Sequence, residues 1–154
     1  MLARTAADMQ RLGALLGRQL RAGDVVGLIG PLGAGKTTFV QGMARGLEVA
    51  PDRHVASPTF ALVNEHPGRV LFVHADLYRI REAGELVELG LADLYDKAAV
   101  AIEWLDRFPD AAPEDRLEIV IEPAGGANRP RRVTVRATGP RARERARAFE
   151  AAAE

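Results

Sequence analysis

The chain of 154 residues contains no cysteine, and this absence excludes disulfides, thiolate metal sites and cysteine nucleophiles. Lysine is scarce as well: Lys36 and Lys97 are the only two among 21 basic residues, and the others are arginine. Because acidic residues also number 21, no overall field draws the chain to DNA or to an anionic membrane. A link to nucleic acid therefore requires a local patch or a partner protein.

Long apolar runs are also missing. No stretch could span a bilayer, and residues 1–20 lack the apolar core of a secretory signal, so the expected location is the cytoplasm. At 47% apolar and 27% charged residues, the composition is that of an ordinary soluble globular protein. The length favours a single domain over residues 1–154, in which residues 140–154 form either a C-terminal helix or a frayed tail.

The first third of the sequence predicts a helix, a buried strand and a second helix. Thr5 is a suitable helix cap, and apolar residues then recur at helical spacing as far as about Arg21. The run "VVGLIG" (residues 25–30) is typical of a strand covered on both faces, and residues 36–47 predict the next helix. A strand, a glycine turn and a helix in this order form half of a βαβ unit.

The remaining elements predict a mixed sheet. Two apolar segments flank Pro67-Gly68 and are expected to pair as an antiparallel hairpin. Residues 82–97 predict two short helices broken at Gly90, and residues 109–113 predict a loop. Apolar or alternating patterns indicate three more strands, the last of them an edge strand with one wet face: residues 99–104, 117–122 and 131–138.

The stretch Gly30-Pro-Leu-Gly-Ala-Gly35-Lys36-Thr37 fits the phosphate-loop pattern G-x-x-x-x-G-K-[ST] at every fixed position. Glycines let consecutive backbone N–H groups point inward, and the following helix adds the positive end of its dipole. Lys36 is expected to reach the β- and γ-phosphates of ATP, Thr37 to ligate Mg²⁺ and Thr38 to contact the α-phosphate. The predicted nucleotide-binding residues of the loop are Gly30, Leu32, Gly33, Ala34, Gly35, Lys36, Thr37 and Thr38.

A phosphate loop also needs a carboxylate from a neighbouring strand for the metal, and a group that positions water. Such groups gather beyond the carboxyl ends of parallel strands. Three acids close apolar runs and remain open as candidates: Asp76, Glu103 and Glu122, of which Glu122 is the weakest because proline and glycines follow it. His74 shares a strand face with Asp76 and could pair with it, although a structural histidine is the simpler interpretation.

Two further features allow either a structural or a nucleotide-linked interpretation. Trp104, the only tryptophan, directly follows Glu103 and either packs in the core or lies beside the nucleotide. The segment "ASPTF" (residues 56–60) is either a plain turn or a switch loop that senses the γ-phosphate.

The order and spacing of five motifs resemble the TsaE (YjeE) family, small bacterial ATPases needed for threonylcarbamoyladenosine at position 37 of tRNA. The motifs are "GPLGAGKTTF", "SPTF-LV", "H-DLYR", "ELVELGL-DLY" and "EW", and the likeness runs from about Leu12 to Glu122. Pro31 departs from the pattern, because the family often carries Asp or Asn there. The segments outside the likeness match poorly, so no adenine or ribose contacts are assigned.

The resemblance implies a single-domain phosphate-loop NTPase-like α/β fold, with a central mixed, largely parallel sheet, an antiparallel hairpin and helices on both faces. It implies a Mg²⁺-dependent ATPase that is slow alone and works with two partners, TsaD and TsaB. These partners transfer the threonylcarbamoyl group to N6 of the tRNA adenosine, and ATP hydrolysis allows repeated turnover. The tRNA would be reached indirectly, through that complex.

The resemblance also implies roles for particular residues. At matching positions, Thr37 and Glu103 are the implied magnesium ligands, and Lys36, Asp76 and Glu103 are the implied catalytic residues. Trp104 would lie near the nucleotide. The loop that holds Ser57 and Thr59 would be the switch.

Two other functions remain open. A small-molecule phosphate-loop kinase would need a second-substrate pocket and usually an arginine lid, for which Arg79 and Arg81 are candidates, but no lid-sized insertion is visible. A nucleotide-sensing binding module would bind ATP without turnover, even with partners present. Phosphate release without an added acceptor distinguishes the ATPase from the kinase.

Overall fold

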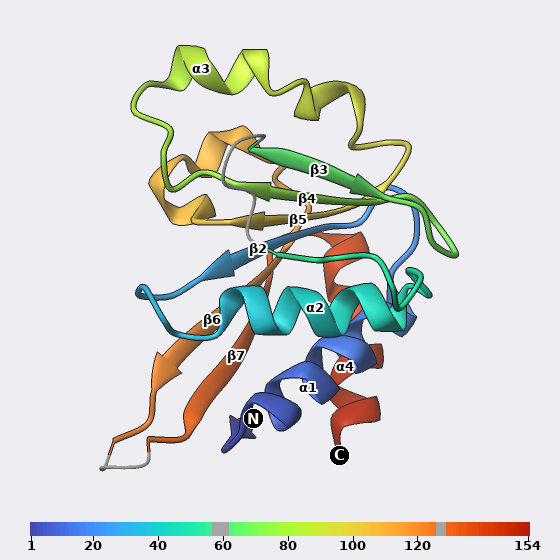
Figure 1. Cartoon of the computed structure of the whole chain (residues 1–154), viewed down its shortest axis with the longest axis vertical. Coiled ribbons are helices and arrows are strands. Elements are labelled where there is room, and N and C mark those ends of the chain that lie inside the picture. Colours follow the sequence, from blue (N-terminus) through green and yellow to red (C-terminus); the bar gives the residue numbers. More distant parts are fainter. Residues whose placement is uncertain (57–61, 126–128) are drawn as a thin grey trace.

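The computed structural model describes residues 1–56, 62–125 and 129–154, and its strands form one mixed sheet (Figure 1). The strand order across the sheet is β1-β7-β6-β2-β5-β4-β3. The strand bounds are β1 Leu2–Ala3, β2 Val25–Ile29, β3 Val63–His66, β4 Phe72–Asp76, β5 Ala99–Glu103, β6 Leu117–Pro123 and β7 Arg131–Ala137. The central strands β6, β2, β5 and β4 run parallel, and the outer pairs are antiparallel. The predicted mixed α/β fold is therefore confirmed, including the hairpin at Pro67-Gly68.

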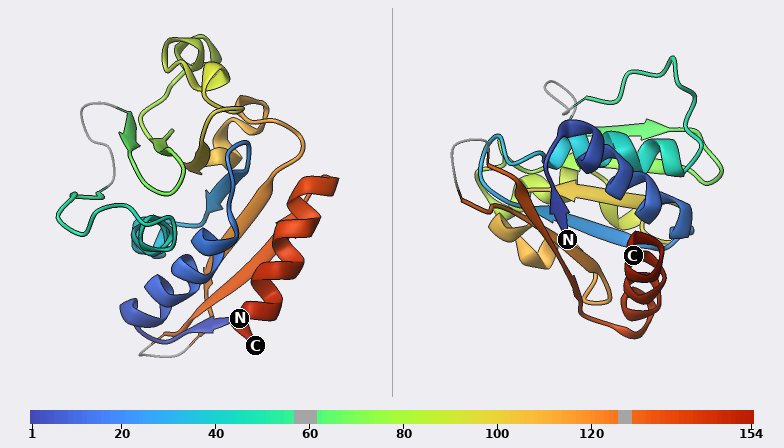
Figure 2. Two further views of the ribbon diagram at one scale, coloured as in Figure 1. Left: turned by 90° about the vertical axis from the view of Figure 1, so that its right-hand side faces the viewer. Right: turned by 90° about the horizontal axis from the view of Figure 1, so that it is seen from below.

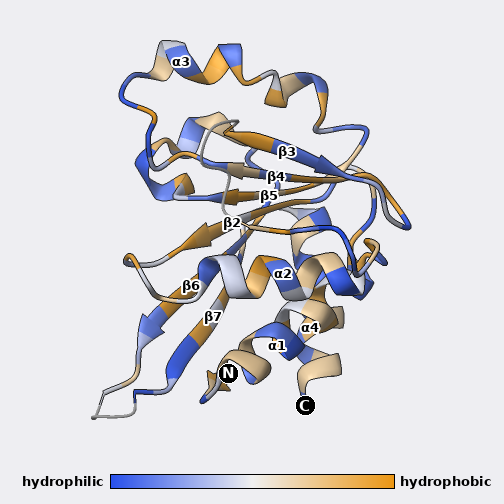
Figure 3. Ribbon diagram, in the orientation of Figure 1, coloured by the Kyte–Doolittle hydropathy of each residue, from blue (hydrophilic) through white to orange (hydrophobic). Residues whose placement is uncertain are grey.

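The sequence patterns of the strands match their positions in the sheet. The central strands β2, β4 and β5 are buried, and their mostly orange colour in Figure 3 shows that they are mainly apolar. In β7, Val133 faces the core while Arg132, Thr134 and Arg136 are exposed. The prediction that β7 is the edge of the sheet is wrong for its first residues, because the two-residue strand β1 pairs with them. A strand of two residues has no periodicity from which it could be predicted.

The longer helices lie on one face of the sheet, and short helices cover the other. The first group is α1 Ala6–Gln19, α2 Lys36–Gly46 and α4 Pro140–Ala153, with α1 and α4 side by side (Figure 2). The second group is α3 Ala83–Glu88 and three 3₁₀ turns, η1 Leu91–Asp93, η2 Leu105–Arg107 and η3 Pro109–Ala111. The predicted loop at residues 109–113 therefore contains a helical turn. Within the described residues, every helix is too short or too polar to cross a bilayer.

Helix boundaries follow local chemistry. Thr5 caps α1: its side chain accepts from the backbone N–H of Asp8, whose carboxylate accepts in return from the Thr5 backbone. Gly90 separates α3 from η1 with φ of 70°, a left-handed conformation that favours glycine. The residues 140–153, for which helix and frayed tail were both open, form α4, and Phe149 in it is fully buried.

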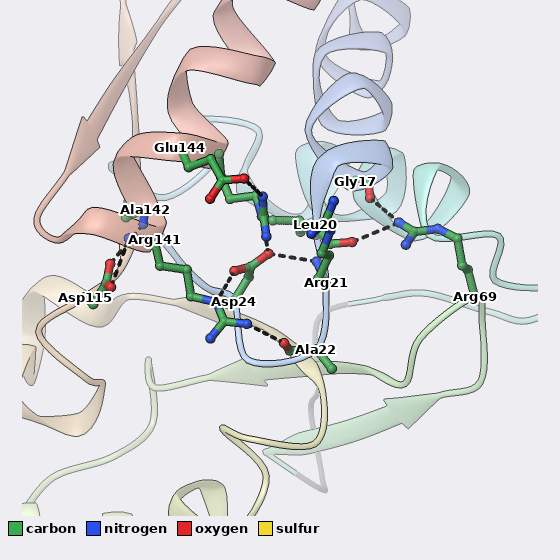
Figure 4. Close-up of polar contacts among 11 residues, drawn as sticks. Gly17, Leu20, Arg21, Ala22, Asp24, Arg69, Asp115, Arg141, Ala142 and Glu144 are labelled. Carbon is green, nitrogen blue, oxygen red and sulfur yellow. Dashed lines mark hydrogen bonds and ion pairs between the residues drawn. The ribbon is translucent and has the colours of Figure 1, made fainter.

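A buried carboxylate ties α4 to the start of β2 (Figure 4). Asp24 is 3% exposed and accepts from Arg141 Nε at 2.8 Å, Arg145 Nε at 2.7 Å and the Arg21 backbone N–H at 2.7 Å. Asp115 accepts from the first backbone N–H groups of α4. These bonds join the C-terminal helix to the central strand, and a buried charge of this kind requires such partners.

Helices α1 and α2 touch backbone to backbone through four glycines. A Cβ atom added to Gly13 would lie 2.1 Å from the Phe39 carbonyl oxygen, and one added to Gly42 would lie 2.1 Å from the Gln10 carbonyl oxygen. Gly17 and Gly46 extend the same contact. Because α2 begins at Lys36, directly after the glycine loop, the contact also fixes where that loop lies.

Replacing Gly42 with alanine tests this contact. The added methyl group has no space, so we expect the free energy of unfolding to fall by about 1–3 kcal/mol in chemical denaturation. The matched control is Gly84→Ala in α3, where an added Cβ meets nothing within 4 Å. That variant should be unchanged or more stable by up to about 1 kcal/mol, because alanine favours helix. Equal stability of both variants would contradict the close approach of α1 and α2.

Candidate nucleotide site

A cavity of about 370 Å³ lies at the carboxyl ends of β2, β5 and β4, where the glycine loop after β2 faces the ends of the next two strands across the sheet. This is the edge at which parallel sheets gather their ligands. Most of the predicted residues line it, together with Tyr78 and Arg79: Leu32, Gly33, Gly35, Lys36, Thr37, Thr38, Asp76, Glu103 and Trp104. Gly30 and Ala34 lie outside this lining, although both belong to the loop.

The glycine loop is folded around its own lysine. Gly33 and Gly35 have φ of 77° and 109°, which only glycine adopts without strain. The Lys36 ammonium group donates to the carbonyl oxygens of Gly30 at 2.7 Å and Pro31 at 2.9 Å. Pro31 has no N–H to offer a ligand, but its carbonyl also accepts from the Ala34 backbone at 3.0 Å. The proline therefore supports the loop through its acceptor.

Lys36 also lies against the only tryptophan. Its ammonium nitrogen is 4.0 Å from the centroid of the Trp104 ring, and the residue is 5% exposed. Burial lowers the pKa of Lys36 below its usual value, and three nearby carboxylates oppose that shift: Glu103, Asp76 and Asp106. Two hydrogen bonds to carbonyl oxygens and one contact with an aromatic ring hold the ammonium group. A bound phosphate would have to replace the two hydrogen bonds.

The turn after β5 is strained. Trp104 has φ of 62°, a left-handed conformation that is costly for a bulky residue, and its N–H donates to the Leu28 carbonyl at 3.0 Å. Its ring stacks on Tyr78 with centroids 5.0 Å apart. Strain of this kind concentrates at functional sites. Here the turn places Glu103 on the loop side and the Trp104 ring over Lys36.

Glu103 is the carboxylate that contacts the phosphate loop. It is 3% exposed, and Thr37 Oγ1 donates to its Oε1 at 3.0 Å and lies 3.3 Å from its Oε2. In the register between the parallel strands β4 and β5, Asp76 lies opposite Glu103, and its side chain lines the same cavity. Glu122, the third candidate, is exposed on β6 opposite Arg132, away from that cavity. The structure brings together two of the three acids.

His74 is a residue of the site that the sequence did not assign to it. Its Nε2 atom lies 2.6 Å from Glu103 Oε2, and the residue is fully buried. The sequence favoured a structural histidine and left a pairing with Asp76 open, since both lie on one strand face. The true partner depends on the register between β4 and β5, which a single sequence does not contain.

The donors around the cavity suit magnesium held jointly with a phosphate ligand. Thr37 and Glu103 offer adjacent oxygens, and Asp76 lies beside them. In the described part of the chain, no group of three or more His, Cys, Asp or Glu residues is arranged to hold a metal. Magnesium needs no such cluster, because it uses one or two protein groups and completes its shell with phosphate oxygens and water.

A second cavity, of about 200 Å³, adjoins the first and shares Gly33, Gly35 and Thr38 with it. Its lining includes three arginines that sequence analysis did not single out: Arg4, Arg129 and Arg131. The Arg131 side chain donates to the Ala34 carbonyl at 3.2 Å, so β7 supports the glycine loop from behind. No local signal marks this contact, which joins residues 97 positions apart.

A larger cavity, of about 750 Å³, lies between α1, α2 and residues 48–55. Its described lining contains none of the predicted site residues, so we assign no chemistry to it. The predicted switch residues Ser57 and Thr59 lie outside the described residues.

Comparison with known proteins adds an independent finding. The family model for the threonylcarbamoyl adenosine biosynthesis protein TsaE matches residues 3–133. The tRNA threonylcarbamoyladenosine biosynthesis protein TsaE of Treponema pallidum is 36% identical over 129 residues, which cover 83% of this chain and 94% of that protein. The protein of the same name from Bacillus subtilis is 41% identical over 123 residues, covering 79% and 74%. The crystal structure of Bacillus subtilis YdiB superposes with a TM-score of 0.80 at 28% identity, over 97% of this chain and 92% of that one.

The contact between Lys36 and Trp104 can be tested by fluorescence. In the ligand-free protein, we expect Lys36→Met to change the fluorescence emission of Trp104, because the substitution removes the positive charge next to the indole ring. A cation–π contact of this kind contributes about 0.5–2 kcal/mol. Lys97→Met is the matched control, since Lys97 is the other lysine and is exposed. An unchanged spectrum for Lys36→Met would mean that the ring and the ammonium group are apart in solution.

Proposed function

The chain belongs to the TsaE family of threonylcarbamoyl adenosine biosynthesis proteins, and from this premise we propose that it is the ATP-hydrolysing subunit in forming the threonylcarbamoyl group on N6 of adenosine 37 in tRNA. The observation that carries the proposal is the joint arrangement of the phosphate loop, Thr37 and a buried carboxylate. Enzymes that hydrolyse nucleoside triphosphates commonly combine a phosphate-binding loop with nearby oxygen ligands for magnesium.

The chain's own groups account for binding of the triphosphate. The backbone N–H groups of the loop and the N-terminus of α2 provide the anion site, and Lys36 exchanges its two carbonyl partners for phosphate oxygens. Thr37 can ligate a metal through a lone pair of its oxygen while its hydroxyl continues to donate a hydrogen bond to Glu103. Bound Mg²⁺ supplies charge neutralisation and orients the phosphates. Asp76 lines the same cavity and would orient the attacking water.

The nucleoside would extend into the second cavity. Thr38 and Gly35 border both cavities, and Thr38 is the residue expected at the α-phosphate. A ligand whose terminal phosphates lie beside Lys36 therefore leaves the loop toward Arg4, Arg129 and Arg131. Guanidinium groups can stack on a base and donate to ribose oxygens.

Two exposed side chains at the rim of the site support the further proposal that a partner protein covers it. Leu32 is 77% and Tyr78 48% exposed, and both line the nucleotide cavity. Large apolar side chains at the rim of a site are suited to a protein that covers it. We propose TsaD and TsaB as these partners, with tRNA reached through their complex, in the cytoplasm. The alternatives are a small-molecule kinase and a nucleotide-sensing module without turnover.

Phosphate release with ATP and Mg²⁺, and no added acceptor, tests the catalytic part. We expect Lys36→Ala to lose ATP binding, because the loop loses its only side-chain cation. Thr37→Ala and Glu103→Gln should lower the rate about 10²-fold or more, the usual cost of removing one preorganised electrostatic contact. Lys97→Ala is the control and should match the wild type. A normal rate for Glu103→Gln would show that another carboxylate serves the metal.

Co-purification with TsaD and TsaB tests the partner part. We expect this chain to bind the pair in the presence of ATP and to release phosphate faster in the complex. Binding without faster release would favour the nucleotide-sensing module. Phosphate transfer to a small acceptor, without release to water, would favour the kinase.

A further inference from the structure

We propose that His74 is a positioning residue: its imidazole N–H holds the Glu103 carboxylate in the orientation that binds Mg²⁺. The proposal rests on the nucleotide-binding function proposed above and assigns a role that neither the phosphate-loop pattern nor the family motifs supply. His74 does not touch the cavity itself, and it acts through Glu103.

The geometry fixes both oxygens of Glu103 from two different elements. His74, on β4, lies 2.6 Å from Oε2, and Thr37, on α2, lies 3.0 Å from Oε1. A carboxylate that ligates Mg²⁺ is ionised and offers only acceptors, so the proposed role makes His74 Nε2 the donor of this bond. A donor on each oxygen restricts rotation of the carboxylate, and Glu103 is part of the cavity lining. A magnesium ligand needs that fixed orientation.

Packing alone does not account for a histidine at this position. His74 is fully buried on a strand whose neighbours Phe72, Val73 and Ala75 are apolar and fully buried. An imidazole is costly to desolvate, and an aliphatic side chain would fill this space without that cost. The imidazole differs from an aliphatic residue in its N–H, and that N–H is directed at Glu103.

A second buried histidine shows what a structural role looks like in this fold. His66, on β3, is 3% exposed, and its Nδ1 accepts from Arg53 Nε at 2.9 Å. Burial lowers the pKa of His66, which keeps the ring neutral and able to accept. This contact joins β3 to the preceding loop and does not involve the nucleotide cavity. His66 is therefore a matched control for His74.

Loss of the His74 donor leaves Glu103 Oε2 buried without this partner. The carboxylate can then rotate toward another donor, such as Lys36, and this rotation weakens its interaction with Mg²⁺. Removing the hydrogen-bond partner of a metal ligand usually lowers metal affinity about 10–100-fold. The affinity of the loop for nucleotide without metal should change little, because Lys36 and the loop backbone are intact.

The experiment measures binding of a non-hydrolysable ATP analogue by calorimetry, with Mg²⁺ and with a chelator, together with the melting temperature of each protein. The variants are His74→Leu, which fills the space without a donor, and His74→Gln, whose amide N–H replaces Nε2–H at similar reach. We expect the gain in affinity from Mg²⁺ to fall about 10–100-fold in His74→Leu and to return largely in His74→Gln. The control His66→Leu should have a lower melting temperature, but Mg²⁺ should raise its affinity for the ATP analogue as much as in the wild type.

The outcomes separate this role from stability and from the proposed function. If His74→Leu folds and Mg²⁺ raises its affinity for the ATP analogue as much as in the wild type, the role of His74 is overturned. If His74→Leu does not fold, His74→Asn replaces it, because its shorter amide does not reach Glu103. If Mg²⁺ then raises nucleotide affinity equally in His74→Asn and His74→Gln, the proposed role of His74 is overturned. A wild-type protein that binds no nucleotide under either condition overturns the proposed function, and the role of His74 with it.

Discussion

Burial of the Glu103 carboxylate at the end of β5 is the constraint on which the site depends. At 3% exposure, a charged group is stable only if the protein supplies donors and opposite charge. His74 and Thr37 supply the donors, and Lys36 supplies a nearby charge. The strained turn at Trp104 brings the same carboxylate and an aromatic face to the loop. Because Glu103 is almost fully buried, each of these contacts counts for more than it would at the surface.

The parts of the molecule that sequence alone predicts are those determined by neighbouring residues. The phosphate loop is such a part, because its glycines, Lys36 and Thr37 occupy fixed positions in one short segment. Thr5 as a cap, Gly90 as a break and the turn at Pro67-Gly68 are local in the same sense. In each case, the chemistry of a few adjacent residues decides the backbone conformation.

The parts that could not be predicted are set by contacts between distant segments. Asp76, Glu103 and Glu122 each close an apolar run in the sequence, and the pairing of β4 with β5 is what brings Asp76 and Glu103 together, while Glu122 lies outside the cavity. The same register brings His74 to Glu103. Arg131 reaches the glycine loop from the opposite end of the chain. The C-terminal helix is amphipathic only weakly in sequence and is held by the buried Asp24, a partner more than a hundred residues away.

The glycine contact between α1 and α2 has a mechanical consequence. Carbonyl oxygens of one helix rest on the Cα atoms of the other, so no layer of side chains can slide or change rotamer between them. The two helices therefore move as one rigid body, with α1 acting as a brace for the helix that carries Lys36 and Thr37. In the proposed ATPase, conformational differences between nucleotide states would then arise in the connecting loops and in the orientation of this body on the sheet, while the helices themselves keep a fixed separation.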